Sequence, residues 1–346
     1  MKDTYQKLLE LETTPEALEA TVVYLADRIR PFLQVLEPVL ICFLDEGPKS
    51  LGGIFKAAVQ RCEAKPVLWG PDYRWKELLR LAFDTHANTI IGSPQIVLGL
   101  MKLARASATP LYAYDVIVTG DPFAPWMIDG IKKGYDCNVW GCYAVGSGPV
   151  IGGFSCNHEV GIHLRNDVFR PCLQRDDENS VLNRGRLYFE CVKDPQLLFD
   201  PEIKVLLHHQ PCSCGCDEPR AVDVRSIRKD ALLREYLEGE LLSWSSVLDY
   251  HVEYTQSGAA LELVVFPGEA IPQLPSFAKQ KVRFWNPQED VPFCLQKKTE
   301  KLSENTLETH CLFPFLCVEC IRICKDYAET KQGSHPKREG IGASPR

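Results

Sequence analysis

The stretch Thr89-Ile90-Ile91-Gly92-Ser93-Pro94 decides the fold class, because a short apolar run ends there in a turn. A helical pattern of apolar side chains follows directly, over residues 95–104. The same order of strand, turn and helix recurs along the chain, with strands expected at 39–43, 66–69 and 114–118. We therefore predict an α/β protein with a mostly parallel sheet flanked by helices.

Helices are expected in the segments between these strands. The clearest covers residues 14–34, where Thr14 is a suitable N-cap and Pro15 occupies the first helical position. Further helical patterns end at Val59 or cover residues 75–83 and 125–133. In a parallel sheet ligands bind at the carboxyl ends of strands, so the loops after residues 91 and 118 are the expected site.

The pattern changes after residue 148, and this change defines the predicted domains. We expect an α/β core at 1–148, a β-rich zinc-knuckle subdomain at 149–220, a small α+β module at 221–324 and a disordered tail at 325–346. Strands are predicted at 161–164, 185–189, 247–254 and 261–266, and a helix at 275–282.

The charge and hydropathy of the chain exclude two classes of partner. The 346 residues carry a formal net charge of −7, which argues against nucleic acid binding across the surface. No apolar run reaches the roughly 18 residues that span a bilayer, and the first residues lack an apolar signal segment. We therefore expect a cytoplasmic protein without a membrane partner.

The chain has 15 cysteines, and most of them are expected to be reduced, buried side chains. Cys212, Cys214 and Cys216 form a tighter cluster, which is typical of a metal site. A second group between Cys311 and Cys324 follows helical spacing. A buried apolar face explains that second group, and a second zinc or a redox pair stays open.

Four short motifs in order resemble the adenylate-forming superfamily. Residues 116–122 (Val-Ile-Val-Thr-Gly-Asp-Pro) are similar to its strand and loop that usually reads Gly-Gly-Glu-Pro. Residues 134–143, with Trp-Gly-Cys-Tyr at their end, resemble the stretch that ends Tyr-Gly-x-Thr-Glu. Residues 152–163 and 211–215, with Gly-Gly-Phe-Ser-Cys, Gly-Ile-His and Pro-Cys-Ser-Cys-Gly, resemble the phenylacetate–CoA ligase branch. The resemblance covers about residues 40–220.

This resemblance implies that a carboxylic acid is activated by ATP as its acyl-adenylate and then transferred to a thiol such as CoA. The implied ligands are therefore ATP or AMP, CoA and the acid. The nucleotide or acyl pocket would involve Thr119, Gly120, Asp121, Pro122, Trp140, Gly141 and Tyr143. The module at 221–324 lies where the superfamily has its mobile lid, and homodimers occur in the family.

The sequence departs from the superfamily at the groups that handle the triphosphate. A Gly/Ser/Thr-rich loop should precede residue 14, but residues 5–12 hold no glycine and two acids. Ala144 replaces the expected Glu, which argues against a Mg²⁺ site. Residues 206–210 lack the ribose-binding Asp, and no Pro-x-Gly-Lys motif follows Leu261. The chain therefore resembles a shortened member without the phosphate-binding loop.

A structural zinc site is implied at Cys156, His163, Cys212 and Cys214. Four protein ligands complete a tetrahedral zinc sphere and leave no open position. Cys216, His158 or His208 could replace one ligand, and the alternative is a loop of reduced cysteines.

Two functions follow from these observations. The first is a phenylacetate–CoA ligase-like, AMP-forming enzyme, for which the sequence names no catalytic residue. The second is a catalytically degenerate homologue that binds a nucleotide or acyl-CoA, or serves as the partner subunit of a ligase.

Overall fold

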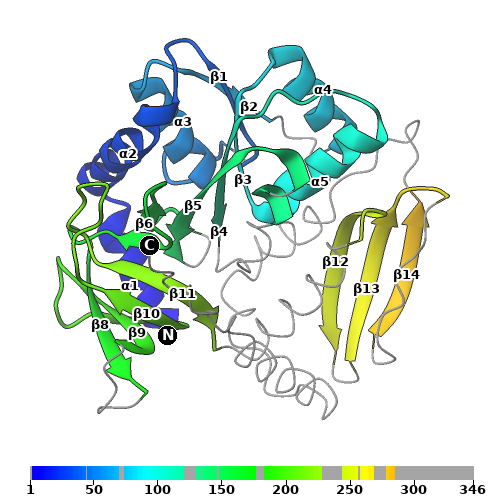
Figure 1. Cartoon of the computed structure of the whole chain (residues 1–346). Helices are drawn as coiled ribbons and strands as arrows, with labels where there is room; N and C mark the ends of the chain where they lie inside the picture. Colours follow the sequence, from blue (N-terminus) through cyan, green and yellow to red (C-terminus); the bar gives the residue numbers. More distant parts are fainter. Residues whose placement is uncertain are drawn as a thin grey trace, which may run out of the picture.

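A computed structural model describes residues 2–43, 45–69, 74–120, 130–132, 134–145, 148–176, 183–227, 244–255, 258–268 and 278–284 (Figure 1). The strands of the first part alternate with helices, as the sequence predicts. They are β1 (Pro38–Ile41), β2 (Lys65–Leu68), β3 (Thr89–Gly92), β4 (Asp115–Gly120) and β5 (Asn138–Ala144). All neighbours in the order β2-β1-β3-β4-β5 run parallel.

The same sheet continues beyond β5 with antiparallel strands. These are β6 (Ile151–Ser155), β7 (Ile162–Leu164), β8 (Phe169–Arg175), β9 (Arg184–Cys191), β10 (Leu198–His208) and β11 (Arg220–Ser226). Their order after β5 is β6-β7-β11-β10-β9-β8, which makes one sheet of 11 strands within the described residues. The expectation of a mostly parallel sheet is thus correct only for the first five strands, and the sheet is mixed. The predicted β-rich segment is part of this sheet.

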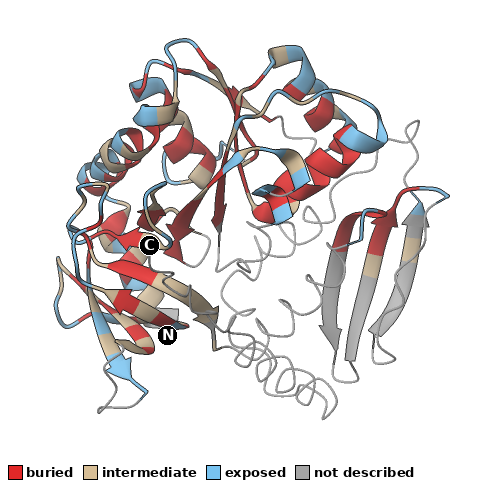
Figure 2. Cartoon of the chain, in the orientation of Figure 1, coloured by how far each residue is buried: buried red, intermediate tan, exposed pale blue. Residues whose placement is uncertain are grey.

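Helices cover both faces of the parallel half. One face packs against α2 (Pro15–Ile29), which continues into the 3₁₀ turn η1 (Arg30–Phe32), and against α3 (Leu51–Arg61). The other face packs against α4 (Trp75–Thr85) and α5 (Pro94–Ala106). A further helix, α1 (Lys2–Glu12), packs against the antiparallel half through Leu8. Buried side chains concentrate between these layers (Figure 2).

Two helix starts follow directly from the sequence. Thr14 accepts a hydrogen bond from the backbone of Ala17 at 3.3 Å, and Ser93 accepts one from Ile96 at 3.3 Å. A proline fills the first position of both helices. This combination satisfies free N–H groups and fixes the backbone where each helix begins. No helix within the described ranges has the length and apolar character that crossing a membrane requires.

A second sheet follows near the C-terminal side. It consists of β12 (Val247–Thr255), β13 (Gly258–Val265) and β14 (Ala278–Phe284), with β12 antiparallel and β14 parallel to β13. The helix predicted at 275–282 is wrong for residues 278–282, which belong to β14. Val282 of this strand is partly buried and packs against the core cluster that contains α4 and α5. Residues 285–346, with the cysteines from Cys311 to Cys324, lie outside the described residues, and the domain boundaries stay predictions.

Candidate functional site

Strand pairing brings the four predicted zinc ligands together. Cys156 directly follows β6, His163 lies on β7, and Cys212 and Cys214 lie in the loop between β10 and β11. Strand β7 pairs with β6 on one side and with β11 on the other. The two loops are therefore neighbours in space, although about 50 residues separate them in the chain.

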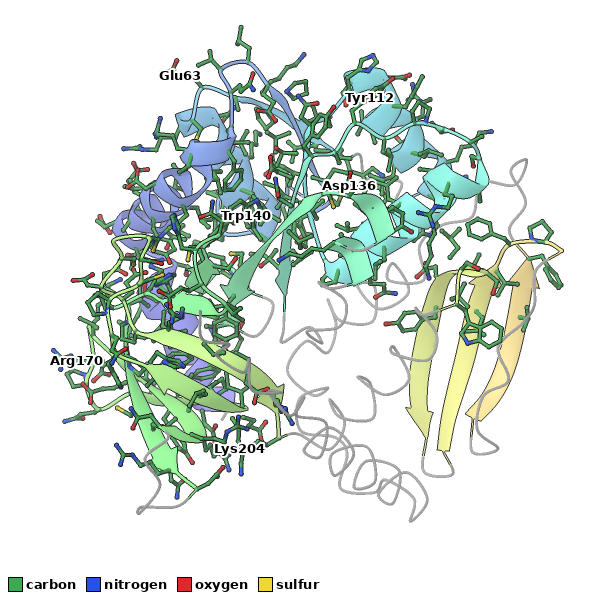
Figure 3. All side chains as sticks on the ribbon, viewed as in Figure 1. Glu63, Tyr112, Asp136, Trp140, Arg170 and Lys204 are labelled. Carbon is green, nitrogen blue, oxygen red and sulfur yellow. The ribbon has the colours of Figure 1, made fainter. Side chains whose placement is uncertain are left out.

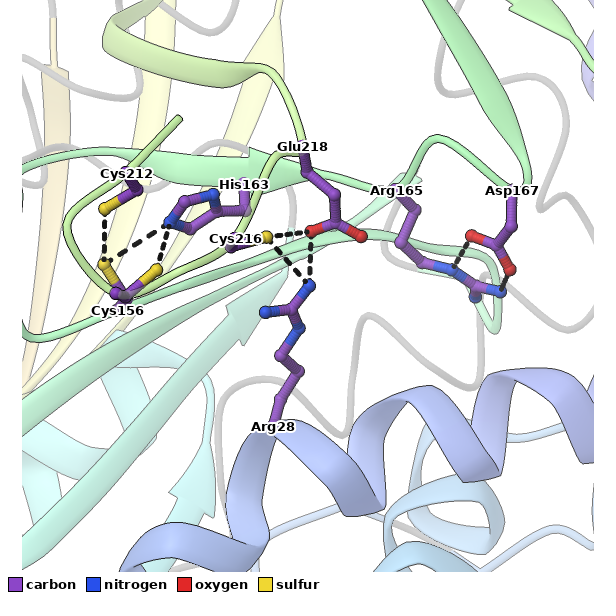
Figure 4. A network of polar contacts seen from close by, with 9 residues as sticks. Arg28, Cys156, His163, Arg165, Asp167, Cys212, Cys216 and Glu218 are labelled. Atoms are coloured by element: carbon purple, nitrogen blue, oxygen red, sulfur yellow. Dashed lines mark hydrogen bonds and ion pairs between the residues drawn. The ribbon is translucent and has the colours of Figure 1, made fainter. Parts of the chain in front are cut away.

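The four side chains converge on one point (Figure 4). Cys156 Sγ lies 3.6 Å from Cys212 Sγ and 3.4 Å from His163 Nε2, and Cys214 Sγ lies 3.6 Å from the same Nε2. A tetrahedral zinc ion has edges of about 3.8 Å between two sulfurs and about 3.6 Å between sulfur and nitrogen. All four ligand atoms lie within 4.8 Å of one another. Three of the six separations therefore agree with those of a Cys₃His zinc site, and the four atoms lie close enough together to hold one metal ion.

Hydrogen bonds within the polypeptide hold this arrangement. The backbone N–H of Gly215 donates to Cys212 at 2.9 Å, and that of Cys212 donates to Cys216 at 2.9 Å. Gly215 has φ +86°, a conformation that glycine adopts without strain. Glu159 accepts hydrogen bonds from Ser213 at 3.0 and 3.2 Å. This carboxylate thus connects the loop after Cys156 to the Cys212–Cys214 loop.

Burial and hydrogen bonds shift the pKa values of the cluster residues. The pKa of Cys214 is raised to about 11. Burial is the main cause, and the neighbouring Cys212 and Cys156 add to it. Burial opposes ionisation of Cys212 as well, but hydrogen bonds from Cys214 and Cys156 lower its pKa. Burial lowers the pKa of His163, which favours the neutral imidazole that metals bind. The pKa directions of Cys212 and His163 favour the thiolate and the neutral imidazole, which are the forms that bind a metal, whereas that of Cys214 favours the neutral thiol.

Cys216 belongs to a different set of contacts. Its Sγ accepts a hydrogen bond from Arg28 of α2 at 3.4 Å, and the same guanidinium pairs with the carboxylate of Glu218 (Figure 4). His163, Cys216 and Glu218 also lie close enough to form a metal-binding group. Arg28 already places a positive charge there, so a second cation is unfavourable. Neither His158 nor His208 belongs to either group among the described residues.

A buried polar layer continues from Arg28 to the centre of the sheet. The ring of Tyr24 contacts two guanidinium groups, with its centroid 5.0 Å from Arg28 Cζ and 4.6 Å from Arg165 Cζ. Arg165 is 1% exposed and donates hydrogen bonds to Thr21 at 3.0 Å and to Asp167 at 2.6 and 3.0 Å. Cation–π contacts and charged hydrogen bonds of this kind fasten α2 to the strands that carry the cluster.

The predicted nucleotide or acyl residues lie on β4 and β5. These strands pair in parallel, with Thr119 opposite Cys142 and Gly120 opposite Tyr143. The carboxyl ends of both strands therefore meet at one edge of the sheet. Gly141 donates its backbone N–H to Ser155 at 2.7 Å. Asp121 and Pro122 lie outside the described residues.

Trp140 and Tyr143 point to opposite faces of β5. Trp140, which is labelled in Figure 3, stacks on Phe32 with 4.8 Å between ring centroids, and its indole N–H donates to Asp115 at 3.1 Å. These contacts hold it against the α2 side of the sheet. Tyr143 is 6% exposed and packs with the core of the antiparallel half, 6.1 Å from the ring of Phe189. The contacts of Trp140 are those of a core residue.

The segment expected to contain a phosphate loop is helical. Residues 5–12 are part of α1, and Tyr5 donates its hydroxyl hydrogen to the carbonyl of Val145 at 3.2 Å. A side chain at Gly148 would meet the Tyr5 hydroxyl at 2.4 Å. Helix α1 thus contacts the turn that follows β5, next to Ala144, where the superfamily motif places its Mg²⁺-directing carboxylate.

Several residues of the site carry no signal in the sequence. Arg28 and Arg165 are isolated basic residues on α2 and after β7, and only the packing of the helix on the sheet shows their partners. Glu159 and Glu218 lie three residues after Cys156 and two after Cys216. Their closeness to the cysteines is the one feature of the sequence that could have indicated them.

No family model matches the chain, and no curated protein matches it either. The fold does match solved structures of 2-hydroxyisobutyryl-CoA ligase. One, in the postadenylation state with R3-HIB-AMP, is 13% identical with a TM-score of 0.54 over 84% of this chain and 72% of that chain. A second, with 2-HIB-AMP, is 14% identical with a TM-score of 0.54 over the same shares of 84% and 72%.

An open conformation of the same ligase, with 2-HIB-AMP and CoA, is 16% identical with a TM-score of 0.50. That alignment covers 63% of this chain and 58% of the other, so the chain spans little more than half of that ligase structure. The chain therefore shares the fold of these ligase structures, and at 13–16% sequence identity the likeness shows the fold alone.

Proposed function

We propose that this protein activates a carboxylic acid as an acyl-adenylate and transfers the acyl group to a thiol such as CoA in the cytoplasm. The observation that carries the proposal is the fold match over 84% of the chain to a ligase structure that holds an acyl-adenylate. The four motifs between residues 116 and 215 support the phenylacetate–CoA ligase-like branch.

The proposed pocket is the edge where β4 and β5 end. Thr119 and Gly120 would line it from β4, and Gly141 and Tyr143 from β5, with Asp121 and Pro122 in the following loop. Backbone groups at the carboxyl ends of parallel strands suit a nucleotide, because this edge of an open sheet is its usual binding place. Trp140 would support the edge from below through its contacts with Phe32 and Asp115.

We further propose that Cys156, His163, Cys212 and Cys214 bind a structural zinc ion. The support is the set of 3.4–3.6 Å separations between their ligand atoms. With four protein ligands the ion would supply no Lewis acid for a substrate. It would instead join the β6–β7 turn to the β10–β11 loop and add its binding energy to folding.

One observation favours a second function, that of a catalytically degenerate homologue. Such a protein would bind AMP or acyl-CoA without turning over ATP, or would associate with a partner ligase or with a second copy of itself. Helix α1 occupies the segment where a phosphate loop is expected, and Tyr5 contacts Val145 beside the end of β5. A helix of this composition offers the triphosphate no cradle of free N–H groups, and the absence of a Glu at position 144 removes a Mg²⁺ ligand.

A pyrophosphate-release assay separates the two functions. The purified protein is incubated with ATP, Mg²⁺, CoA and single acids from a panel of aliphatic and aromatic acids, and AMP and acyl-CoA are measured alongside. The ligase proposal predicts acid-dependent pyrophosphate release with AMP in equal amounts. Calorimetric binding of AMP or of a non-hydrolysable acyl-adenylate without any release would instead establish the second function and refute the first.

Elemental analysis tests the metal site. The protein purified without chelator should contain about one zinc per chain, and Cys214→Ser should reduce this content because the site loses one of its three thiolate ligands. Cys172→Ser is the matched control, since Cys172 is an exposed cysteine on β8 outside the cluster. Equal zinc content in both variants would remove Cys214 from the ligand set.

A further inference from the structure

Two sulfurs of the cluster lie almost close enough to form a bond. The Sγ atoms of Cys156 and Cys212 are 3.6 Å apart, although 56 positions separate the two residues in the chain (Figure 4). A disulfide bond is about 2 Å long, so the two sulfurs need to approach by about 1.6 Å. Cys156 directly follows β6, and Cys212 lies in the loop between β10 and β11. A side-chain rotation with a small shift of either loop can supply this movement.

Contacts within the polypeptide hold the two loops against one another. Strand β7 pairs with β6 on one side and with β11 on the other. Glu159, three residues after Cys156, accepts hydrogen bonds at 3.0 and 3.2 Å from Ser213, the residue after Cys212. The same carboxylate pairs with Arg220 at the start of β11. Two groups held together in this way react as if they were present at a very high concentration.

Hydrogen peroxide is an oxidant that can join this pair. Cys156 is half-buried and Cys212 is 5% exposed, so peroxide reaches Cys156 first. The Cys156 thiolate attacks one peroxide oxygen, the O–O bond breaks, and a sulfenic acid and hydroxide form. The Cys212 thiolate then attacks the sulfenic sulfur, the S–S bond forms, and a second hydroxide leaves. Two thiolates, one peroxide and two protons thus become one disulfide and two water molecules.

This disulfide would change what connects the two loops. It would remove two of the four ligands and leave His163 and Cys214, which are too few for a structural zinc site. It would also join the same two loops covalently and restrict the unfolded chain across 56 positions. A disulfide between Cys212 and Cys214 would instead close a ring of three residues and connect nothing outside their loop.

We infer that Cys156 and Cys212 form a peroxide-sensitive pair, whose disulfide replaces the metal as the link between the β6–β7 turn and the β10–β11 loop. Oxidation then releases the metal without freeing the two loops, and reduction by a thiol restores the ligands. Disulfides of proteins in a reducing compartment are usually of this reversible kind. The inference rests on the proposed zinc site and is independent of whether the protein turns over ATP.

Peroxide treatment of the full-length, zinc-loaded protein tests this inference. Released zinc is measured with a chromogenic chelator, free thiols are alkylated, and the disulfides are mapped by mass spectrometry of unreduced peptides. We expect about one zinc ion to be released for each Cys156–Cys212 disulfide formed, and dithiothreitol with added zinc to reverse both changes. The oxidised protein should melt several degrees above reduced protein from which a chelator has removed the zinc.

Two variants give the comparison. Cys212→Ser should form no such disulfide, whereas Cys172→Ser, which alters an exposed cysteine on β8, should react like the wild type. A disulfide between Cys212 and Cys214, or oxidation to sulfinic acid without a disulfide, would overturn the inference. So would an oxidised protein that melts no higher than the reduced, zinc-free one. The map of the wild-type peptides decides alone if Cys212→Ser does not fold.

Failure of the inference and failure of the zinc site give different results. A protein that contains no zinc as purified refutes the zinc site and, with it, the exchange of metal for disulfide. A protein that contains zinc but forms no disulfide between Cys156 and Cys212 under peroxide refutes the inference and leaves the zinc site intact.

Discussion

Gly99→Ala should destabilise the protein although alanine is the better helix former. The added Cβ would lie 2.0 Å from Trp75 Cη2, 2.7 Å from Cζ3 and 2.9 Å from Cζ2. Ordinary contacts of a Cβ start near 3.4 Å, so the fully buried ring must move by more than 1 Å. That shift also strains the hydrogen bond from Trp75 to the buried Asp249.

The net effect follows from three contributions. Overpacking a dense core costs about 1–3 kcal/mol. A weakened hydrogen bond to a charged group costs about 1.5 kcal/mol more. The gain in helix propensity on replacing glycine offsets about 1 kcal/mol. We therefore expect a loss of roughly 2–3 kcal/mol in the free energy of unfolding.

Urea denaturation measures this loss from the midpoint at constant slope. Gly130→Ala is the control, because a Cβ there meets no atom within 4 Å, and it should change the stability by less than about 0.5 kcal/mol. In a Trp75→Phe background, which lacks the outer ring atoms, Gly99→Ala should cost clearly less. A Gly99→Ala protein as stable as wild type, or an equal cost in both backgrounds, would refute the contact between α4 and α5.

Three further outcomes are expected. Removal of metal with a chelator should lower the melting temperature of the wild type. The melting temperature of Cys214→Ser should be lower from the start and should hardly change with the chelator. An equal fall in both proteins would contradict the zinc site. Gly153→Ala should destabilise the folded protein by about 1–3 kcal/mol, because the added Cβ would lie 2.2 Å from the His163 carbonyl oxygen on the paired strand β7. Thermal unfolding measures the effect. Gly134→Ala is the control, since a Cβ at position 134 meets no atom within 4 Å. Burial lowers the pKa of Lys102 to about 8 from its usual 10.5, so the folded state binds fewer protons than the unfolded state between these values and its stability rises with pH there. The stability of wild type relative to Lys102→Met should thus rise by roughly 2 kcal/mol from pH 8 to pH 10 in urea titrations, and a flat or falling difference would show that the carbonyls of Trp244 and Val247, which accept hydrogen bonds from Lys102, keep the ammonium charged.

Much of the parallel half could be predicted from local patterns. The apolar run at Thr89–Gly92, followed by Ser93 and Pro94, indicates both the end of β3 and the cap of α5, because strand, cap and first helical turn depend on neighbouring residues. The segment at 278–282 shows the limit of this reasoning. It pairs in parallel with β13, and a pairing partner some 20 residues away leaves no mark in the local pattern.

The sequence by itself determined the alternation of strands and helices, the close spacing of Cys212, Cys214 and Cys216 that first indicated a metal site, and the absence of a glycine-rich loop before Thr14. Only the tertiary structure decided that β7 lies between β6 and β11 and so brings Cys156 and His163 to Cys212 and Cys214. It also decided that Trp140 faces Phe32, that Arg28 holds Cys216 and Glu218, and that Lys102 and Asp249 form hydrogen bonds between α5 and the segment that contains β12. The physical reason is that burial and charge pairing depend on which surfaces meet in three dimensions, whereas propensity, capping and spacing act between residues that are close in the chain.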